Sequence, residues 1–279
     1  MYKRIILISR TDRQDSVELA KKIHGFLKDR GLEVLVEESL ASKLGVEGVS
    51  LSGVEADLAV VVGGDGTVLR AVYQLEARVP LFTVSMGRVG FYGEALPDEA
   101  LKVLDEALKG KLLEERCFMI EADVEGLPPA LNEIRIGGET PQRMVELSIL
   151  IDGLEIARDR VDAILVSTPS GASAYALSAG ASIVDPRLNA ILVVPVCPLS
   201  ANFKPYIVPS DVEVSVKPEP PAEMAWIVGV DGHSVRRLDP PRTVKVKRSS
   251  REVVFLRRRR NFYERLKRRF TVSYPAKNS

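Results

Sequence analysis

Apolar residues in the first third of the chain recur with two different periods. An unbroken apolar run predicts a strand buried on both faces at residues 58–62, and shorter apolar stretches predict strands at residues 4–9, 32–36 and 80–85. Apolar residues at helical spacing predict helices at residues 15–29 and 97–108, the second ending before Gly110. The Gly-containing stretch of residues 41–53 is predicted to be a loop. Alternation of strand and helix indicates an α/β unit with a parallel sheet.

The pattern changes after Lys111 to short alternating strands separated by turn residues. One predicted hairpin joins residues 149–151 to residues 154–157 through Asp152-Gly153. We therefore predict two domains, an α/β domain at residues 1–110 and a β-rich domain at residues 111–256.

The C-terminal tail, from about residue 257 to 279, is strongly basic. It contains the run Arg257-Arg258-Arg259-Arg260 and a second basic group that alternates with apolar residues at helical spacing. This spacing favours a helix that packs one face on the first domain, although basic runs can also bind nucleic acid.

The whole-chain composition excludes several classes of site. The 279 residues carry a net charge of +1, and only two cysteines and two histidines occur, so neither a disulfide framework nor a zinc cluster is expected. No run approaches the roughly 20 apolar residues that cross a bilayer, and the first residues resemble a strand rather than a signal peptide. We expect a cytoplasmic protein with no membrane partner.

A glycine-rich turn follows the most apolar predicted strand. The residues Gly63-Gly64-Asp65-Gly66-Thr67 come directly after the run at 58–62, at the edge of a parallel sheet where ligands bind. Thr67 is predicted to cap the next helix, whose N-terminal N–H groups would attract phosphate. Asp65 would be the one acid in an anion site, holding a metal ion or accepting a proton from an attacking hydroxyl. An ordinary Asp-Gly turn is the alternative.

A second segment combines hydroxyl groups with small side chains. The residues from Ser167 to Gly180 predict a strand end, a turn and a short helix that a flat ligand could approach closely. An ordinary Ser/Thr-rich helix start is equally consistent with this segment alone.

Taken together, these motifs resemble those of the NAD kinases, in the same order along the chain. The resemblance covers about residues 58–233 and includes the glycine-aspartate turn, which lipid kinases and phosphofructokinases share. Its other elements are Gly87-Arg88-Val89-Gly90-Phe91, Asn132-Glu133, the stretch from Asp162 to Ser178, Pro195-Val196-Cys197-Pro198 and Val230-Asp231-Gly232. The fold class it implies is a Rossmann-like α/β N-terminal domain with a parallel sheet plus a β-rich, NAD-binding C-terminal domain.

The resemblance also implies roles for individual residues. Asp65 would be the catalytic base for phosphorylation of the adenosine ribose 2′-hydroxyl of NAD. The residues implied in binding the dinucleotide and its phosphates are Gly66, Arg70, Asn132, Glu133, Arg143, Arg160, Asp162, Ser170, Ser173, Ala174, Tyr175, Ala176, Leu177, Ser178 and His233. No side chain is assigned as a metal ligand, although Mg²⁺ or another divalent metal is expected with the donor, which is ATP or polyphosphate.

The resemblance further implies a homodimer or homotetramer. Two alternatives to an NAD kinase stay open: a lipid or sugar kinase with the same glycine-aspartate turn, and a non-catalytic protein that binds a nucleotide or nucleic acid. The Asn132-Glu133 pair and the stretch from Asp162 to Ser178 favour a dinucleotide over a lipid, and no nucleic-acid partner is expected.

Overall fold

A computed structural model describes residues 2–86, 90–140, 143–222, 224–260 and 262–270, which form two compact units. Of these residues, those up to 116 and those from 253 onwards form the first unit, and those from 117 to 252 form the second. Strand β5 (Leu113–Ala122) and strand β15 (Val244–Arg257) each run from one unit into the other. The sequence placed the boundaries at 110/111 and 256/257, a few residues from those of the structure.

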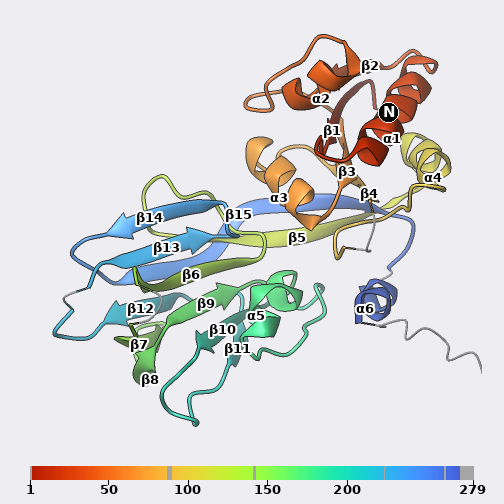
Figure 1. Ribbon diagram of the computed structural model, residues 1–279. Coiled ribbons are helices and arrows are strands. Elements are labelled where there is room, and N and C mark those ends of the chain that lie inside the picture. The colour runs from red at the N-terminus through yellow and green to blue at the C-terminus, as the bar shows by residue number, and fades with distance from the viewer. Residues whose placement is uncertain (1, 87–89, 141–142, 223, 261, 271–279) are drawn as a thin grey trace, which may run out of the picture. The chain divides into compact units, whose positions relative to one another are not determined.

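The first unit is built on parallel strands in the order β2-β1-β3-β4, with Phe255 at the end of β15 paired to Leu81 (Figure 1). Its elements are β1 (Arg4–Ser9), α1 (Gln14–Lys28), β2 (Glu33–Val36), α2 (Glu38–Leu44), β3 (Leu58–Gly63), α3 (Asp65–Gln74), β4 (Leu81–Ser85), α4 (Ala100–Leu108) and α6 (Phe262–Phe270). Every residue of β1 after Arg4 and of β3 and β4 is buried, as expected for a sheet covered on both faces. The predicted α/β class is confirmed.

Helix α2 corrects one prediction. Residues 41–53 were expected to be a loop, yet α2 occupies Glu38–Leu44 and ends at Gly45, whose φ of 68° is left-handed. Its buried residues, Leu40 and Ala41, join the core formed by α1, α4 and the sheet. The three glycines of this stretch were read as loop residues, but one of them terminates a helix.

The second unit contains two antiparallel arrangements of strands. One sheet has the order β11-β10-β9-β6-β13-β14, and in the other the strands follow the order β15-β12-β7-β8. The strands are β6 (Glu133–Gly138), β7 (Val145–Ile151), β8 (Leu154–Val161), β9 (Ala163–Ser167), β10 (Ala190–Val196), β11 (Tyr206–Pro209), β12 (Val214–Pro218), β13 (Trp226–Val230) and β14 (Ser234–Leu238). The predicted β-rich class and the hairpin at Asp152-Gly153 are confirmed.

The central strands β6, β9 and β13 of the six-stranded sheet bring three motifs together at one end of these strands: the Asn-Glu pair, the hydroxyl-rich segment and the turn that contains Asp231. Glu133, the first residue of β6, lies opposite Ser167, the last residue of β9. On its other side β6 pairs with β13, whose last residue, Val230, lies opposite Ile134. The chain segments that follow β9 and β13 therefore leave the sheet beside Glu133.

Candidate active site

The glycine-aspartate turn joins β3 to α3 in the first unit. Helix α3 begins at Asp65, and Gly64 is its N-cap residue in an extended conformation. Thr67 was predicted to cap this helix, and that prediction is wrong, because Thr67 lies within its first turn. Its hydroxyl oxygen would be 2.4 Å from a Cβ atom at Gly63. Gly63 therefore has to be glycine because the Thr67 side chain fills the space beside it.

Open space lies next to the other two glycines of the turn. A Cβ atom added to Gly64 or Gly66 would meet nothing within 4 Å. A cavity of about 330 Å³ is lined by Arg10, Asp12, Gly64, Gly66, Thr67 and Arg70. Backbone N–H groups at the start of a helix and two guanidinium groups suit an anion such as a phosphate.

The carboxylate of Asp65 is held by the backbone of a neighbouring loop. Its Oδ2 accepts the N–H of Phe91 at 3.0 Å, and its Oδ1 accepts the N–H of Tyr92 at 3.1 Å. A Cβ atom at Gly90 would lie 2.2 Å from Oδ1, so this approach requires glycine. Gly87, Arg88 and Val89 of the same motif lie outside the described residues. The Asp65 carboxylate is thus oriented at the first residue of α3.

Arg70 lies one turn further along α3 and forms an ion pair with Glu37. Both guanidinium Nη atoms donate to the Glu37 carboxylate, one of them at 3.1 Å, and the Glu37 side chain is only 7% exposed. The pair fixes Arg70 at the wall of the cavity.

Arg10 was not among the predicted site residues. It follows β1 directly, and its backbone N–H donates to the carbonyl of Val62 at 3.0 Å. Its Nε donates to Asp12 Oδ1 at 2.8 Å. The rule that ligands bind beyond the carboxyl ends of parallel strands could have identified it.

In the second unit, Asp231 organises the start of β6. Its carboxylate accepts the backbone N–H groups of Leu131, Asn132 and Glu133 at 2.7 to 3.1 Å. Asp231 has a φ of 47° and begins the turn between β13 and β14. His233 lies in the same turn, and its Nδ1 is 3.0 Å from the Asp231 carbonyl. The sequence marked Asp231 as part of a motif without giving it a role.

Glu133 has an unusual electrostatic environment. Its side chain is buried beside Asp231, and burial together with that negative charge raises the pKa of Glu133 to about 8, although the backbone N–H of Tyr175 acts in the opposite direction. Among the described residues, its Oε2 is a buried oxygen with no hydrogen-bond partner. Such an atom is suited to meet a donor from a ligand.

The hydroxyl-rich segment after β9 packs against the Asn132 backbone. The N–H of Thr168 and the hydroxyl of Ser167 both donate to the Asn132 carbonyl, at 2.9 and 3.1 Å. A Cβ atom at Gly171 would lie 2.2 Å from that carbonyl oxygen. A short 3₁₀ helix (Gly171–Ser173) and α5 (Tyr175–Ser178) follow. The structure therefore brings the Asn-Glu pair and this segment together.

The predicted residues of this segment differ in their surroundings. Ser173 is buried and its hydroxyl donates to the Ser170 carbonyl at 3.4 Å. Ala176 is fully buried in a core cluster with residues of β9 and β10. The others are partly or fully exposed: Ser170, Ala174, Tyr175, Leu177 and Ser178.

Three predicted residues lie elsewhere in the second unit. Asp162 precedes β9, at the opposite end of that strand from Ser167, and accepts a hydrogen bond from the Cys197 thiol, which raises the pKa of that thiol. Arg160 is exposed on β8, and Arg143 is exposed before β7 and lines a cavity of about 160 Å³. Among the described residues, these three are not at the edge that holds Glu133.

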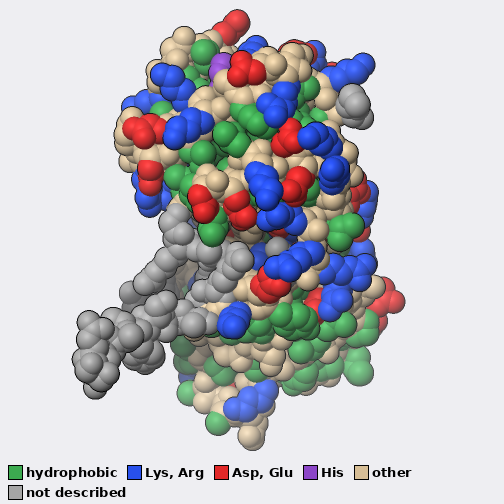
Figure 2. All heavy atoms as spheres, turned by 90° about the vertical axis from the view of Figure 1, so that its right-hand side faces the viewer, with side chains coloured by type: hydrophobic (Ala, Val, Ile, Leu, Met, Phe, Trp, Pro, Cys, Tyr) green, Lys and Arg blue, Asp and Glu red, His purple; other side chains and the backbone are tan. Residues whose placement is uncertain are grey.

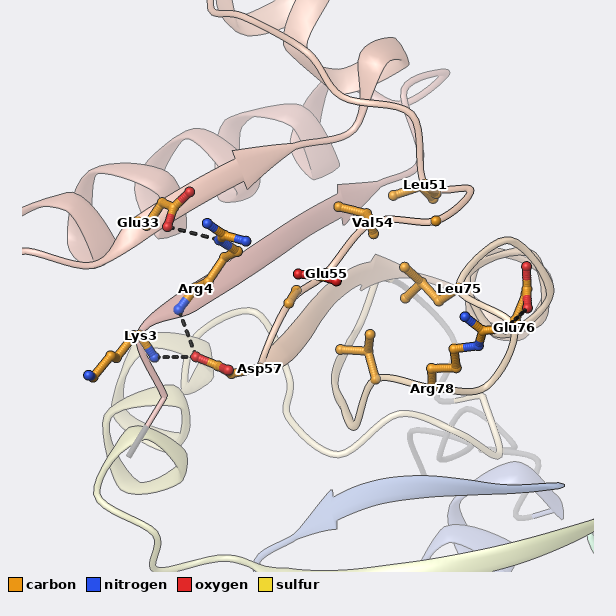
Figure 3. A pocket seen from close by; sticks show the side chains of 13 residues that line it. Lys3, Arg4, Glu33, Leu51, Val54, Glu55, Asp57, Leu75, Glu76 and Arg78 are labelled. Carbon is orange, nitrogen blue, oxygen red and sulfur yellow. Dashed lines mark hydrogen bonds and ion pairs between the residues drawn. The ribbon is translucent and has the colours of Figure 1, made fainter. Parts of the chain in front are cut away.

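A larger cavity lies at the amino ends of β1 and β3, away from the glycine-aspartate turn (Figure 3). Its volume is about 620 Å³. The charged side chains that line it largely pair with one another, as in Arg4 with Glu33 and Arg78 with Glu76. Asp57 accepts the backbone N–H groups of Lys3 and Arg4. This cavity has mixed charge and none of the predicted site residues.

Three arginines of the basic tail pair with carboxylates of the first unit. Arg257 and Arg265 bind Glu115, and Arg258 pairs with Glu99 and Glu106. Acidic and basic side chains are also interspersed on the face shown in Figure 2. These pairings favour the predicted packing of the tail helix over a continuous basic surface for nucleic acid.

The first unit has a parallel α/β fold with an oriented carboxylate in a glycine-rich turn, and an antiparallel β unit follows it in the sequence. This combination is typical of two-domain kinases. Family models support the same class, because residues 5–112 match the ATP-NAD kinase N-terminal domain and residues 131–258 match the ATP-NAD kinase C-terminal domain. The chain belongs to the NAD kinase family, which confirms the resemblance inferred from the sequence, and the protein is an enzyme of the kinase class.

Individual relatives resemble it over nearly their whole length. The NAD kinase of Methanoculleus marisnigri is 35% identical, covering 94% of this chain and 97% of that protein, and the NAD kinase of Thermococcus gammatolerans is 34% identical, covering 95% and 99%. The structure of an NAD kinase from Archaeoglobus fulgidus in complex with ATP is 27% identical, with a TM-score of 0.80, and covers 96% of this chain and 99% of that one. The structure of yeast NADH kinase complexed with NADH shares the fold. It is 23% identical, with a TM-score of 0.82, and covers 98% of this chain and 89% of that one.

Proposed function

We propose that this protein phosphorylates the 2′-hydroxyl of the adenosine ribose of NAD to give NADP, with ATP or polyphosphate as the donor. The observation that carries the proposal is the Asp65 carboxylate, which two backbone N–H groups orient at the first residue of α3. The Archaeoglobus fulgidus relative, whose structure contains ATP, supports ATP as the donor.

In the proposed reaction Asp65 is the general base. The 2′-oxygen attacks the terminal phosphorus of the donor, the bond from phosphorus to the bridging oxygen breaks, and the shortened donor leaves. The proton of the hydroxyl passes to the Asp65 carboxylate. Gly66 has no side chain to keep the sugar away from that carboxylate.

The donor phosphates are proposed to bind in the cavity beside the turn. Arg10 and Arg70 supply fixed positive charge there, and the start of α3 supplies N–H groups. The carboxylates that fix both arginines, Asp12 and Glu37, prevent them from folding away.

A divalent metal is part of this proposal. The described residues contain no group of three or more His, Cys, Asp or Glu side chains that could hold a metal. Mg²⁺ commonly takes only one or two carboxylates together with substrate phosphates and water. Asp12 lines the cavity, and Asp65 lies in the adjoining turn, so these two carboxylates would be the ones to hold it. When bound, Mg²⁺ would neutralise charge on the donor phosphates.

The acceptor is proposed to bind through the second unit. Asn132 and Glu133 would bind adenine and ribose, with the unpartnered Oε2 of Glu133 forming a hydrogen bond with a ribose hydroxyl. The neighbouring pocket residues would be Ser170, Ser173, Ala174, Tyr175, Ala176, Leu177, Ser178 and His233. Asp162, Arg143 and Arg160 would serve the more distant parts of the dinucleotide.

We also propose that the protein is a cytoplasmic homodimer or homotetramer. None of the helices among the described residues is long and apolar enough to cross a membrane. The proposal of an oligomer rests on the resemblance to the NAD kinases. Light scattering after gel filtration should give a mass of two or four chains, and an active monomer would contradict this.

The reaction is tested by incubating the protein with NAD, Mg²⁺ and either ATP or polyphosphate, and by measuring NADP with an NADP-specific dehydrogenase. NADP formed with one donor confirms the reaction and identifies the donor. If neither donor gives NADP although NAD binds, NADH is tested as the acceptor. Failure with both acceptors would overturn the proposal and favour a lipid or sugar kinase or a binding protein.

A further inference from the structure

The backbone of Tyr92 is held from two sides. Its N–H donates to the Asp65 carboxylate at 3.1 Å, and its carbonyl accepts from Arg257 Nη1 at 2.9 Å. Thr83 on β4 donates to the same carbonyl at 2.6 Å. One residue therefore links the proposed base to a guanidinium from the end of the chain.

Aromatic contacts connect the same two regions. The ring of Phe91, whose N–H also donates to Asp65, lies 5.8 Å from the ring of Phe262 at the start of α6. The ring of Tyr92 stacks on Phe255 of β15 with 5.2 Å between centroids. Phe262 and Phe255 are buried, so these rings contribute packing that restricts the loop.

Arg257 is itself firmly placed. Its side chain is only 3% exposed, its Nε donates to Glu115 at 2.6 Å, and its Nη1 is 3.6 Å from the Glu94 carboxylate. Burial acts to raise the pKa of Glu115, but Arg257 and Arg265 outweigh it and hold that pKa below its usual value. Glu115 is therefore ionised at neutral pH and keeps Arg257 in position.

From these contacts we propose that the C-terminal segment positions the catalytic base, with Arg257 and Phe262 holding residues 90–94 where their N–H groups orient the Asp65 carboxylate. The inference rests on the proposed role of Asp65. Arg257 and Phe262 are positioning residues, because they reach the base only through the loop. Small displacements of a reacting group can cost about 100-fold in rate, so the loop requires support from both sides.

The test compares wild type with Arg257→Met, Phe262→Leu and the control Arg258→Met. Arg258 is the neighbouring arginine, and its side chain forms ion pairs with Glu99 and Glu106. Circular dichroism first establishes the temperature range in which each variant is folded. The values of kcat and of KM for NAD are then measured within that range.

We expect kcat of Arg257→Met and of Phe262→Leu to fall about tenfold or more, with KM changed by less than about threefold. Arg258→Met should keep the wild-type kcat. If Arg257→Met does not fold, the kcat and KM of Phe262→Leu alone test the positioning role. Wild-type kcat in the folded variants, or a rise in KM as large as the fall in kcat, would overturn the inference. If wild type forms NADP, such a result removes only the positioning role and leaves the proposed function intact.

Discussion

The carboxylate of Asp231 accepts the backbone N–H of Glu133 at 2.7 Å, and its charge also acts on the Glu133 side chain. One aspartate thus fixes the start of β6, where the Asn-Glu pair lies, and adds to the effect of burial in raising the pKa of Glu133.

Replacing Asp231 should damage this edge of the sheet. In wild type the Asp231 carboxylate accepts three backbone N–H groups. In Asp231→Asn an amide NH₂ group, which cannot accept them, replaces one carboxylate oxygen, so the free energy of unfolding should fall by about 1–3 kcal/mol. NAD affinity should fall as well. Chemical denaturation and calorimetric titration measure the two effects, with Asp211→Asn at an exposed position as the control. Wild-type stability in Asp231→Asn would show that these hydrogen bonds do not support the edge.

The raised pKa of Glu133 predicts a pH dependence of stability. Because the folded pKa of about 8 exceeds the ordinary value of 4.5, the folded protein binds more protons than the unfolded chain between these values. The free energy of unfolding contributed by Glu133 therefore falls as pH rises from about 4.5 to about 8 and levels off above that range.

Glu133→Gln isolates this contribution, because glutamine does not titrate. Relative to Glu133→Gln, wild type should lose on the order of a few kcal/mol of unfolding free energy across that pH window. Denaturant unfolding at several pH values measures it. Parallel curves for the two proteins would mean that Glu133 titrates normally.

Close packing at Gly171 predicts a severe effect of one methyl group. A Cβ atom there would lie 2.2 Å from the Asn132 carbonyl oxygen, which belongs to the backbone and cannot easily move. Gly171→Ala should destabilise the protein by about 2 kcal/mol or more. Gly229→Ala is the matched control, since its Cβ would meet Val235 at 3.6 Å. Equal melting temperatures for the two variants would contradict the prediction.

Arg10 should serve the phosphoryl donor. Arg10→Met removes a guanidinium from the cavity beside the turn, so KM for ATP should rise about tenfold, the loss expected for one hydrogen bond to a charged group. Arg13→Met is the control, because Arg13 makes a similar ion pair with Asp15 but does not line that cavity. A similar KM in both variants would exclude Arg10 from donor binding.

The sequence predicted the sheet well because its strands are buried apolar runs. It failed at α2, where glycines suggested a loop. It also failed at the start of α3, where Gly64 and not Thr67 is the cap, because threonine and glycine have similar preferences for that position. A local pattern indicated the hydroxyl-rich segment, and the family resemblance indicated the Asn-Glu pair. Neither predicted that the pairing of β6 with β9 places the two side by side.

Contacts between residues far apart in the sequence could not be predicted from local sequence patterns. The loop N–H groups that orient Asp65 come from residues 26 and 27 positions later, and Arg257 reaches Tyr92 across 165 positions. The sequence showed Arg257 only as the first residue of a basic run, whereas in the structure its side chain is buried and paired with Glu94 and Glu115.

The central claim is that Asp65 is the general base, and the rate of phosphoryl transfer in Asp65→Asn tests it most directly. Asp57→Asn is a matched control, since Asp57 also accepts two backbone N–H groups but lies at the amino end of β3. We predict a fall of about 100-fold or more in the rate of Asp65→Asn. This variant should stay folded at the assay temperature, although its amide NH₂ group faces one of the two loop N–H groups and lowers the free energy of unfolding by about 1–3 kcal/mol. Asp57→Asn should keep a near wild-type rate. A rate within about twofold of wild type in folded Asp65→Asn would contradict the claim, since loss of a general base costs far more.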